Sequence, residues 1–476
     1  MTGGLPRALC PPPSSCVDLS AAQPLSADDF FVGLLVAEVL LLLGLAVWRH
    51  EGEWLVFTVA LAGKFVAGVA TVAIFAVHYI SSFVNDNVTY HYQGVEHAMA
   101  IRAELGEGEL LEHLVNAVWI GRDVNSTVRF SSASGVFHAL TADSFLGATF
   151  ICGALGFVGQ LLLYRTFVSY YPERWLRPVW WAGVLFWPSL VLWSAGLLKE
   201  SFGFLGLGMT VWGVDRFVSR GRLTSLMWGG FGAYVLMLYR PQILLALFAA
   251  IVPWMLAAGP LSRHGLNAER RGGAWRRGLI GAGIFFGAVA MLVFGAIDPR
   301  YSLAALAGSI GFVISVSEQQ VFAGSNLAAP LIEEVSAWGV LRAWPAALVV
   351  ALFRPFLWEA PGAFGLLAAV ENTVLLALLG RGLWLLVSRE GVALNAVRSP
   401  LLLASVTFVA VMGLTVAIAQ INLGTVSRYR IPLLPFTVAA AAIIEKCARA
   451  PRSVGELLPA SVPAARRIFR AVVTPE

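Results

Sequence analysis

Residues 30–48 read FFVGLLVAEVLLLLGLAVW, a stretch that is apolar almost throughout. A helix needs about 20 such residues to cross the roughly 30 Å of hydrocarbon in a bilayer. Similar runs recur along the chain, at 54–80, 144–164, 178–198, 202–219, 223–239, 242–258, 279–297, 362–388, 400–421 and 431–446. The sequence therefore predicts an all-α fold, a polytopic transmembrane bundle of about eleven helices with outer-face loops and amphipathic helices.

The composition supports the same class of protein. Hydrophobic residues make up 58% of the 476 residues and charged residues only 13%, whereas soluble domains carry about 25% charged residues. The formal net charge is +5, but the basic residues stand in short loops between apolar runs, which indicates topology rather than nucleic-acid binding.

Arginine residues collect in four parts of the chain, at 165–177, 216–222, 259–278 and in the tail 448–476. If the helices alternate in direction, all four lie on one side of the membrane, and the excess of Arg assigns that side to the cytoplasm. We therefore expect a multi-pass protein of the bacterial plasma membrane with its N-terminus outside and its C-terminus inside.

This topology divides the chain into a tail, a transmembrane domain and a second tail. Residues 336–358 contain two arginines and two prolines, so we expect an interfacial or re-entrant helix there rather than a full span. The predicted parts are an extracytoplasmic tail (1–28), the transmembrane domain (29–447) with outer segments 81–143 and 298–361, and a cytoplasmic tail (448–476). Cys10 and Cys16 lie in the first tail, and whether they form a disulfide stays open.

The first outer segment opens with a group of polar residues that includes Asp86, Tyr90 and His91. The Asp86 carboxylate could act as a general base towards a hydroxyl group, or bind a divalent metal beside a phosphate. A helix N-cap is the alternative, because Asp and Asn favour that position.

Four cations stand at outer helix ends, against the positive-inside bias. Lys199 is followed by Glu200 in a tight turn, Arg240 ends another helix, and Arg428 and Arg430 precede the last one. Lys and Arg suit a phosphate ligand. Snorkelling of these side chains to lipid headgroups is the alternative.

Further charged residues lie elsewhere. Lys64 and Glu371 fall in the middle of apolar runs, where charges are costly and are functional candidates by default. The second outer segment carries several carboxylates and is expected to cover a cavity, with a solvated acidic loop as the alternative. These carboxylates are Asp298, Glu318, Glu333, Glu334 and Glu359.

Three motifs together resemble the GT-C class of membrane glycosyltransferases. They are Asp-x-x-x-Tyr-His from Asp86, Pro-Ser-x-x-x-Trp-Ser-x-x-x-Leu-Lys-Glu from Pro188, and Arg-Tyr-Arg-x-Pro-x-x-Pro from Arg428. The resemblance implies a polyprenyl-phosphate or polyprenyl-diphosphate sugar as donor, a glycan, lipid or protein acceptor, and transfer on the outer face among membrane lipids.

The resemblance also implies roles for individual residues. Asp86 would be the catalytic base or the ligand of a divalent cation such as Mg²⁺ or Mn²⁺, and Lys199, Arg240 and Arg428 would hold the phosphate. The full set of candidate substrate-binding residues is Tyr90, His91, Lys199, Glu200, Arg240, Arg428 and Arg430.

Three other functions remain open at this point. A polysaccharide polymerase or ligase would also use outer-side arginines on a lipid-linked glycan. A flippase or transporter of lipid-linked glycan would need charges along a path through the bilayer. A membrane scaffold would leave the outer cations dispersed.

Overall fold

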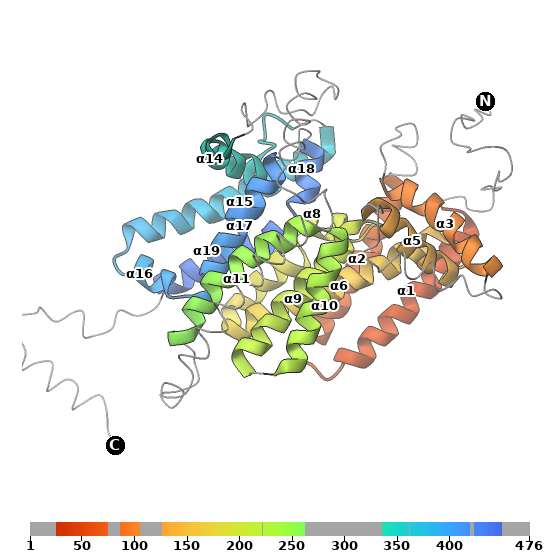
Figure 1. The fold of residues 1–476 in the computed structure, drawn as a ribbon, viewed down its shortest axis with the longest axis horizontal. Helices are drawn as coiled ribbons and strands as arrows, with labels where there is room; N and C mark the ends of the chain where they lie inside the picture. The colour runs from red at the N-terminus through yellow and green to blue at the C-terminus, as the bar shows by residue number, and fades with distance from the viewer. Residues whose placement is uncertain are drawn as a thin grey trace, which may run out of the picture.

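A computed structural model of the chain describes residues 25–74, 86–104, 126–220, 222–261, 336–360, 362–418 and 423–449. All regular secondary structure within these ranges is helical (Figure 1), so the predicted all-α class is confirmed for the described part of the chain.

Two long apolar helices come first in the chain, a pair of more polar helices follows, and a third long apolar helix comes next. α1 (Ala27–Trp48) and α2 (Trp54–Ala73) are followed by α3 (Asp86–Glu104) and α5 (Ser126–Leu140), which pack against each other within the predicted outer segment. α6 (Phe145–Tyr170) then crosses beside α1 and α2.

The connection between α1 and α6 is a shared polar cap. Ser144 caps α6 by accepting a hydrogen bond from the backbone N–H of Gly147 at 2.9 Å. The buried Asp29 carboxylate of α1 accepts bonds from Ser144 Oγ at 2.6 Å and from the Leu146 N–H at 2.9 Å. Because the first amides of a helix have no partner within it, this carboxylate joins the two helices where α6 begins.

The predicted single span at 178–198 is wrong, because this run is broken in the structure. It consists of a 3₁₀ turn η4 (Arg174–Leu176), a short helix α7 (Arg177–Trp180), a π-helical turn η5 (Trp181–Leu185) and the six-residue helix α8 (Pro188–Trp193). Pro188 has no N–H to continue the helix and stands at the first position of α8, where this loss costs nothing.

The following helices agree closely with the apolar runs. α9 (Lys199–Arg220), α10 (Leu223–Tyr239) and α11 (Pro241–Leu261) cover the runs predicted at 202–219, 223–239 and 242–258. In the C-terminal part, α15 (Gly362–Ser388) coincides with the run 362–388, and α17 (Pro400–Ile418) and α19 (Leu433–Arg449) begin within two residues of their predicted starts. The run 279–297 lies outside the described residues.

Three shorter helices complete the C-terminal part. α14 (Ala337–Phe353) packs against α15 and α17, α16 (Val392–Val397) connects α15 with α17, and α18 (Leu423–Tyr429) precedes α19. Figure 1 looks nearly along the axis of α14, whereas α15 and α17 run across the view, so α14 is steeply inclined to them. This orientation is compatible with the interfacial helix expected at 336–358.

Five helices of the described part are long and apolar enough to span a membrane, α1, α2, α6, the Gly365–Ser388 part of α15, and α17. The pair α18 and α19, bent by 65° between Tyr429 and Leu433, would make a sixth if it forms one span. The chain thus carries the helices of a membrane protein, and the number of eleven crossings stays a prediction.

Ion pairs join several of the segments that connect the helices. Arg177 Nη1 lies 2.7 Å from Glu53 Oε1, and Lys446 Nζ lies 2.5 Å from Glu173 Oε1. All four residues belong to the segments predicted to share the cytoplasmic side or to the helix ends beside them. These contacts join the connection 49–53, the connection 165–177 and the end of α19, while the predicted topology as a whole stays a prediction.

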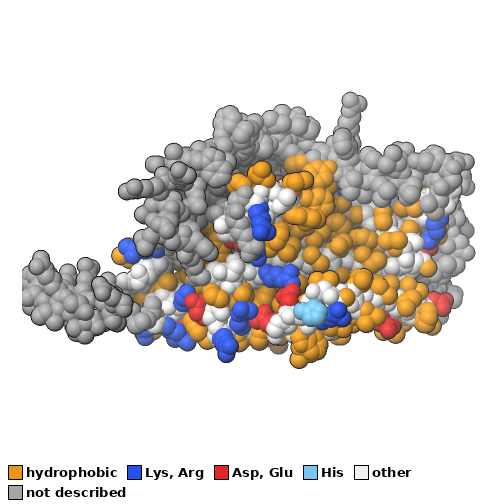
Figure 2. Space-filling view, turned by 90° about the horizontal axis from the view of Figure 1, so that it is seen from below, with side chains coloured by type: hydrophobic (Ala, Val, Ile, Leu, Met, Phe, Trp, Pro, Cys, Tyr) orange, Lys and Arg blue, Asp and Glu red, His pale blue; other side chains and the backbone are white. Residues whose placement is uncertain are grey.

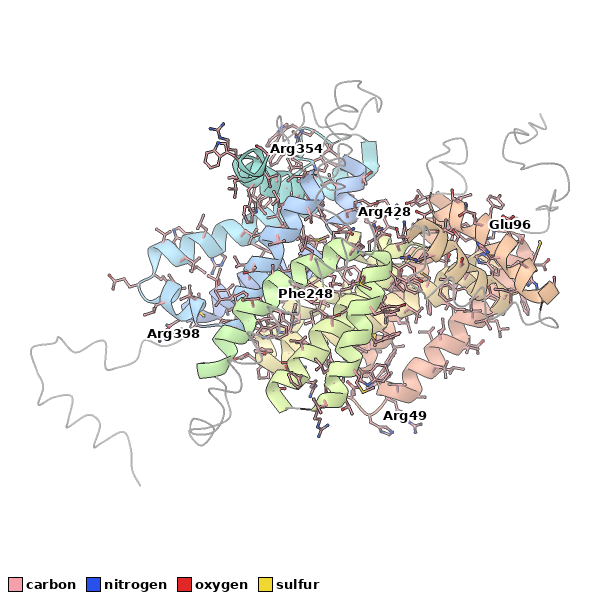
Figure 3. All side chains as sticks on the ribbon, viewed as in Figure 1. Arg49, Glu96, Phe248, Arg354, Arg398 and Arg428 are labelled. Atoms are coloured by element: carbon pink, nitrogen blue, oxygen red, sulfur yellow. The ribbon has the colours of Figure 1, made fainter. Side chains whose placement is uncertain are left out.

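Figure 3 shows where several charged residues lie in the molecule. Arg354 and Arg428 lie on the upper side of the molecule, Arg49 and Arg398 lie on the lower side, and Phe248 of α11 lies between them. In Figure 2, hydrophobic side chains cover broad areas of the face in view and charged side chains gather in patches. This view is from below Figure 1, so it shows the side of the molecule on which Arg49 and Arg398 lie.

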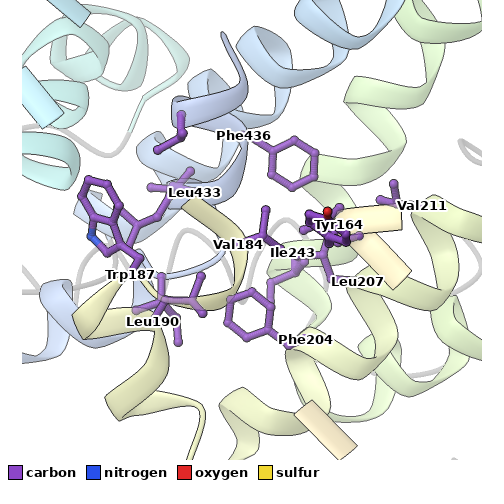
Figure 4. Close-up of a cluster of buried hydrophobic side chains, with 14 of the residues drawn as sticks. Tyr164, Val184, Trp187, Leu190, Phe204, Leu207, Val211, Ile243, Leu433 and Phe436 are labelled. Carbon is purple, nitrogen blue, oxygen red and sulfur yellow. The ribbon is translucent and has the colours of Figure 1, made fainter. Parts of the chain in front are cut away.

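The core holds the broken segment against the surrounding helices. Figure 4 shows part of it, with side chains from η5 and α8, from α9 and from α19 in one cluster. Glycines allow α9 to approach α6 closely, since a Cβ atom on Gly159 would lie 2.0 Å from the Phe204 carbonyl oxygen. Such contacts between small residues are typical of helix packing in membranes.

Candidate functional site

The buried carboxylate of Glu200 is the centre of an ion-pair cluster. Glu200 lies in the first turn of α9, and only 4% of its side chain is exposed. Arg428 of α18 donates from Nε to Glu200 Oε1 at 2.6 Å and from Nη2 to Oε2 at 3.0 Å. Arg240, at the end of α10, also donates to Oε1. One carboxylate therefore holds two guanidinium groups from distant parts of the sequence.

Asp86 joins the cluster from the first turn of α3. Arg428 Nη1 donates to Asp86 Oδ2 at 2.7 Å. The Asp86 side chain is 42% exposed, whereas that of Arg428 is 13% exposed. Among the two carboxylates of the cluster, Asp86 is thus the one that a solute can reach.

Lys199 stands next to Glu200 but points to a different set of partners. Its Nζ donates to Ser126 Oγ at 3.2 Å and to Thr127 Oγ1 at 3.0 Å, and it lies 5.7 Å from the centre of the Tyr90 ring. Burial, reinforced by the nearby Arg240, lowers the pKa of Lys199 to about 8. The amine is therefore mostly protonated at neutral pH, and it changes charge in a range that an experiment can reach.

The cluster carries an excess of one positive charge when all five groups are ionised. Lys199, Arg240 and Arg428 supply three cations, and Asp86 and Glu200 supply two carboxylates. Burial opposes ionisation of Glu200, but Arg240 and Arg428 hold its pKa below the ordinary value of 4.5. A buried cluster with this balance favours an added anion.

A small pocket of about 10 Å³, room for about one water molecule, lies beside these groups. Its polar lining includes Glu200, Arg240 and Arg428, and its apolar lining includes Ile243 and Met412. The Tyr429 ring also lines it, with Arg240 Cζ at 4.5 Å and Arg428 Cζ at 5.7 Å from the ring centre. Charged and apolar walls thus meet in one place.

The structure does not bring His91 to the cluster. His91 is 1% exposed, its Nδ1 lies 2.8 Å from His138 Nε2, and its ring stacks on Phe145 at 4.3 Å. His138 Nδ1 must donate to the Ser134 carbonyl oxygen at 2.8 Å, so His138 Nε2 accepts from His91. Burial, together with His91, lowers the pKa of His138 to about 3. The structure thus places His91, predicted to bind substrate, in the interior beside His138.

Arg430 also leaves the cluster, although only Tyr429 separates it from Arg428. Its side chain is buried, and Nη1 donates to the Arg354 carbonyl oxygen at 3.2 Å. The bend between α18 and α19 turns the two arginines to different neighbours. We therefore no longer assign Arg430 to the group that faces the pocket.

The two charges predicted inside the membrane bind the broken segment. Glu371 of α15 accepts a hydrogen bond from the Ser189 N–H at 2.7 Å, and Lys64 of α2 donates to Ser194 Oγ at 2.6 Å. Both side chains are buried. They touch the two ends of α8 rather than the pocket.

The acidic cover predicted at 298–361 cannot be followed over most of its length. Asp298, Glu318, Glu333 and Glu334 lie outside the described residues. Glu359 pairs with Arg354, with 2.9 Å between Oε1 and Nη2. The carboxylate that offsets Arg240 and Arg428 is instead Glu200, the neighbour of Lys199.

The carboxylates of the cluster face arginine side chains, and binding of a divalent cation by Asp86 stays a prediction. Both oxygens of Glu200 accept bonds from arginine, and Asp86 faces Arg428. Across the described ranges, no three His, Cys, Asp or Glu side chains gather into a set that could hold a metal. We therefore assign no metal-dependent step to these residues.

Sequence reasoning missed several residues that position the cluster. Ser126 and Thr127 bind Lys199, and Ser194 and Gln160 bind each other beside Lys64. Short hydroxyl and amide side chains are common in helices, so their pattern alone gives no signal; only their contacts identify them.

Searches against protein-family models, curated proteins and solved structures find no match to this chain.

Proposed function

We propose that the chain is a membrane glycosyltransferase that moves a sugar from a polyprenyl-phosphate or polyprenyl-diphosphate donor to an acceptor on the extracytoplasmic face. The observation that carries this proposal is the cluster of Asp86, Lys199, Glu200, Arg240 and Arg428. Ion pairs join four of these residues, Asp86, Glu200, Arg240 and Arg428, which come from four separate parts of the sequence. Glu200, Arg240 and Arg428 line one pocket, and Lys199 adjoins Glu200 in the chain.

The donor phosphate binds to the cations of the cluster in this proposal. The site has one positive charge in excess, and guanidinium groups bind phosphate oxygens through charge-assisted hydrogen bonds. Glu200 fixes the planes of Arg240 and Arg428 in advance, which reduces the loss of side-chain freedom on binding. The apolar side chains of Ile243 and Met412 lie next to these cations, as a phosphate attached to a lipid requires.

Asp86 acts as the base towards the acceptor hydroxyl. The hydroxyl oxygen forms a bond to the sugar C1 while the bond from C1 to the phosphate oxygen breaks. Asp86 takes the hydroxyl proton, and the phosphate leaves with the bonding electrons. Lys199 and Arg428 offset the charge that develops on the leaving phosphate. A phosphate that shares Arg428 also weakens the contact between Arg428 and Asp86, which leaves the carboxylate available to the acceptor hydroxyl.

The two enzyme alternatives share this chemistry. A polysaccharide polymerase or ligase would use the same cations on a lipid-linked glycan and would differ in acceptor and product. A flippase gains less support from the described residues, because Lys64 and Glu371 bind the ends of α8 instead of standing along a path.

A donor-consumption assay tests the proposal. Protein in lipid nanodiscs is incubated with radiolabelled undecaprenyl-phosphate hexoses and pentoses and with a membrane extract as acceptor. We expect wild type to transfer label from one donor, Asp86→Asn to lose transfer while it still binds undecaprenyl phosphate, and Glu96→Gln to behave as wild type. Glu96 is the matched control because it is an exposed carboxylate of the same helix α3.

Two outcomes would reject parts of the proposal. Full transfer by Asp86→Asn would remove Asp86 from the reaction. Movement of labelled lipid across the bilayer without transfer of its sugar would favour the flippase alternative.

A further inference from the structure

The short helix α8 is bound at its first residues by a charge from another helix. Glu371 of α15 accepts from the Ser189 N–H through Oε1 at 2.7 Å and from Trp187 Nε1 through Oε2 at 3.2 Å. The N-cap residue Trp187 makes no side-chain cap of its own. The Glu371 carboxylate therefore satisfies a backbone donor that the break at Pro188 leaves without a helical partner.

The other end of α8 is bound by a charge of opposite sign. Lys64 of α2 donates through Nζ to the Ser194 carbonyl oxygen at 3.2 Å and to Ser194 Oγ at 2.6 Å. Gln160 of α6 adds a bond from Nε2 to Ser194 Oγ at 3.2 Å. Ser194 is the residue at which α8 ends, so its carbonyl is one of the acceptors that the helix itself does not use.

Ser194 leads directly to the ion-pair cluster. The turn 194–198 connects it to Lys199 and Glu200, and Ser201 Oγ donates back to the Ser194 carbonyl oxygen at 3.0 Å. A Cβ atom on Gly196 would lie 3.0 Å from Thr71 Cγ2 and 3.3 Å from Asn87 Nδ2. The turn is thus held between α2 and α3, and a shift of α8 would move the first residues of α9.

We propose that Glu371 and Lys64 are positioning residues that hold the two ends of α8 and thereby fix the positions of Lys199 and Glu200. The positioning is independent of the proposed function, whereas its effect on donor binding rests on that function. A charge inside the membrane is costly unless it meets polar partners. A broken helix exposes backbone groups that need partners at the same depth. At α8, the backbone groups freed by the break and the two charged side chains are each other's hydrogen-bond partners.

The positioning is tested by hydrogen exchange of the backbone amides of residues 189–201 in nanodiscs. The variants are Glu371→Gln, Glu371→Leu, Lys64→Gln and Lys64→Met; the Gln variants keep a hydrogen-bonding end and should fold where the apolar ones do not. Asn372→Leu is the matched control, because Asn372 is also buried on α15 but donates to the Pro355 carbonyl oxygen at 2.9 Å.

We expect each variant that folds to raise exchange in 189–201 by about tenfold or more, since a hydrogen bond to a charged group is among the stronger ones. In these variants, exchange in α3 should stay at the wild-type rate. In Asn372→Leu, exchange at 189–201 should also stay at the wild-type rate. Wild-type exchange at 189–201 in the Glu371 and Lys64 variants, or an equal rise in Asn372→Leu, overturns the proposal.

Binding of undecaprenyl phosphate in detergent micelles separates this proposal from the proposed function. We expect the Glu371 and Lys64 variants and Lys199→Met to bind this lipid about tenfold more weakly or worse. If exchange rises at 189–201 but Lys199→Met binds like wild type, the positioning role stands and the proposed donor site fails.

Discussion

Replacement of Glu200 by Gln tests the charge balance of the cluster most directly. Glu200→Gln keeps the size of the side chain but removes the charge that Arg240 and Arg428 share, and it turns one acceptor into a donor that faces a guanidinium group. The side chains of Glu200, Arg240 and Arg428 are 4%, 7% and 13% exposed, so water cannot replace the lost partner.

Loss of one partner of a buried ion pair costs about 3–5 kcal/mol. Asp86 stays close to Arg428 and compensates in part, so we expect a loss at the lower end, about 3 kcal/mol in the free energy of unfolding. Asp86→Asn is the matched comparison. Its carboxylate is 42% exposed and Arg428 retains Glu200, so we expect a loss of at most about 1 kcal/mol.

The same replacement should strengthen binding of a phosphate. Glu200→Gln raises the excess of the cluster from one positive charge to two, and we expect undecaprenyl phosphate to bind about tenfold more tightly. A variant that is less stable when empty and binds its anionic ligand more tightly is not expected from a general packing defect.

The assay is unfolding by SDS in mixed micelles, followed through the fluorescence of the 16 Trp residues, with and without undecaprenyl phosphate. The folded pKa of Glu200 is below its unfolded value, so its contribution is present above the unfolded pKa and is lost as the pH falls through the folded one. The difference between wild type and Glu200→Gln should therefore shrink in acid. Equal stability of the two proteins at neutral pH, or weaker lipid binding by Glu200→Gln, would refute the reasoning.

Three further predictions follow from the same structure. Because the folded pKa of Lys199 is about 8, affinity for undecaprenyl phosphate should fall as the pH rises through 8 in wild type but not in Lys199→Arg; a flat wild-type profile in a binding titration would count against a role of this amine. Gly159→Ala should prevent accumulation of folded protein, since its Cβ would lie 2.0 Å from a backbone oxygen, whereas Gly63→Ala should be tolerated because nothing lies within 4 Å; size-exclusion chromatography checks both. A single cysteine at position 270 should react with a membrane-impermeant thiol reagent only after the cells are opened, and labelling of intact cells would reject the predicted orientation.

The extents of most helices could be predicted from the sequence, because the length of an apolar run is a local property. The runs 223–239 and 362–388 match α10 and α15 residue for residue. The failure at 178–198 has a local cause as well. Hydropathy alone does not register Pro188, whose missing N–H ends the preceding turn and allows a new helix to start.

The sequence predicted most residues of the candidate site, but it did not predict which of them contact one another. Asp86, Lys199, Arg240 and Arg428 stand near helix ends on one predicted side, and the structure brings them together. The sequence does not distinguish Arg428 from Arg430, since they stand two positions apart. The 65° bend between α18 and α19 separates their surroundings, and the bend depends on how both helices pack.

The sequence by itself determined the class of fold and the supply of charges at helix ends, because hydrophobic burial and helix length act over neighbouring residues. Tertiary structure alone decided which charges pair. The rotation of each helix about its axis places Glu200 between Arg240 and Arg428, and it points Lys64 and Glu371 to the ends of α8. Such rotations are set by side-chain packing between segments distant in the chain, for example at Gly159 against α9, and no local pattern encodes them.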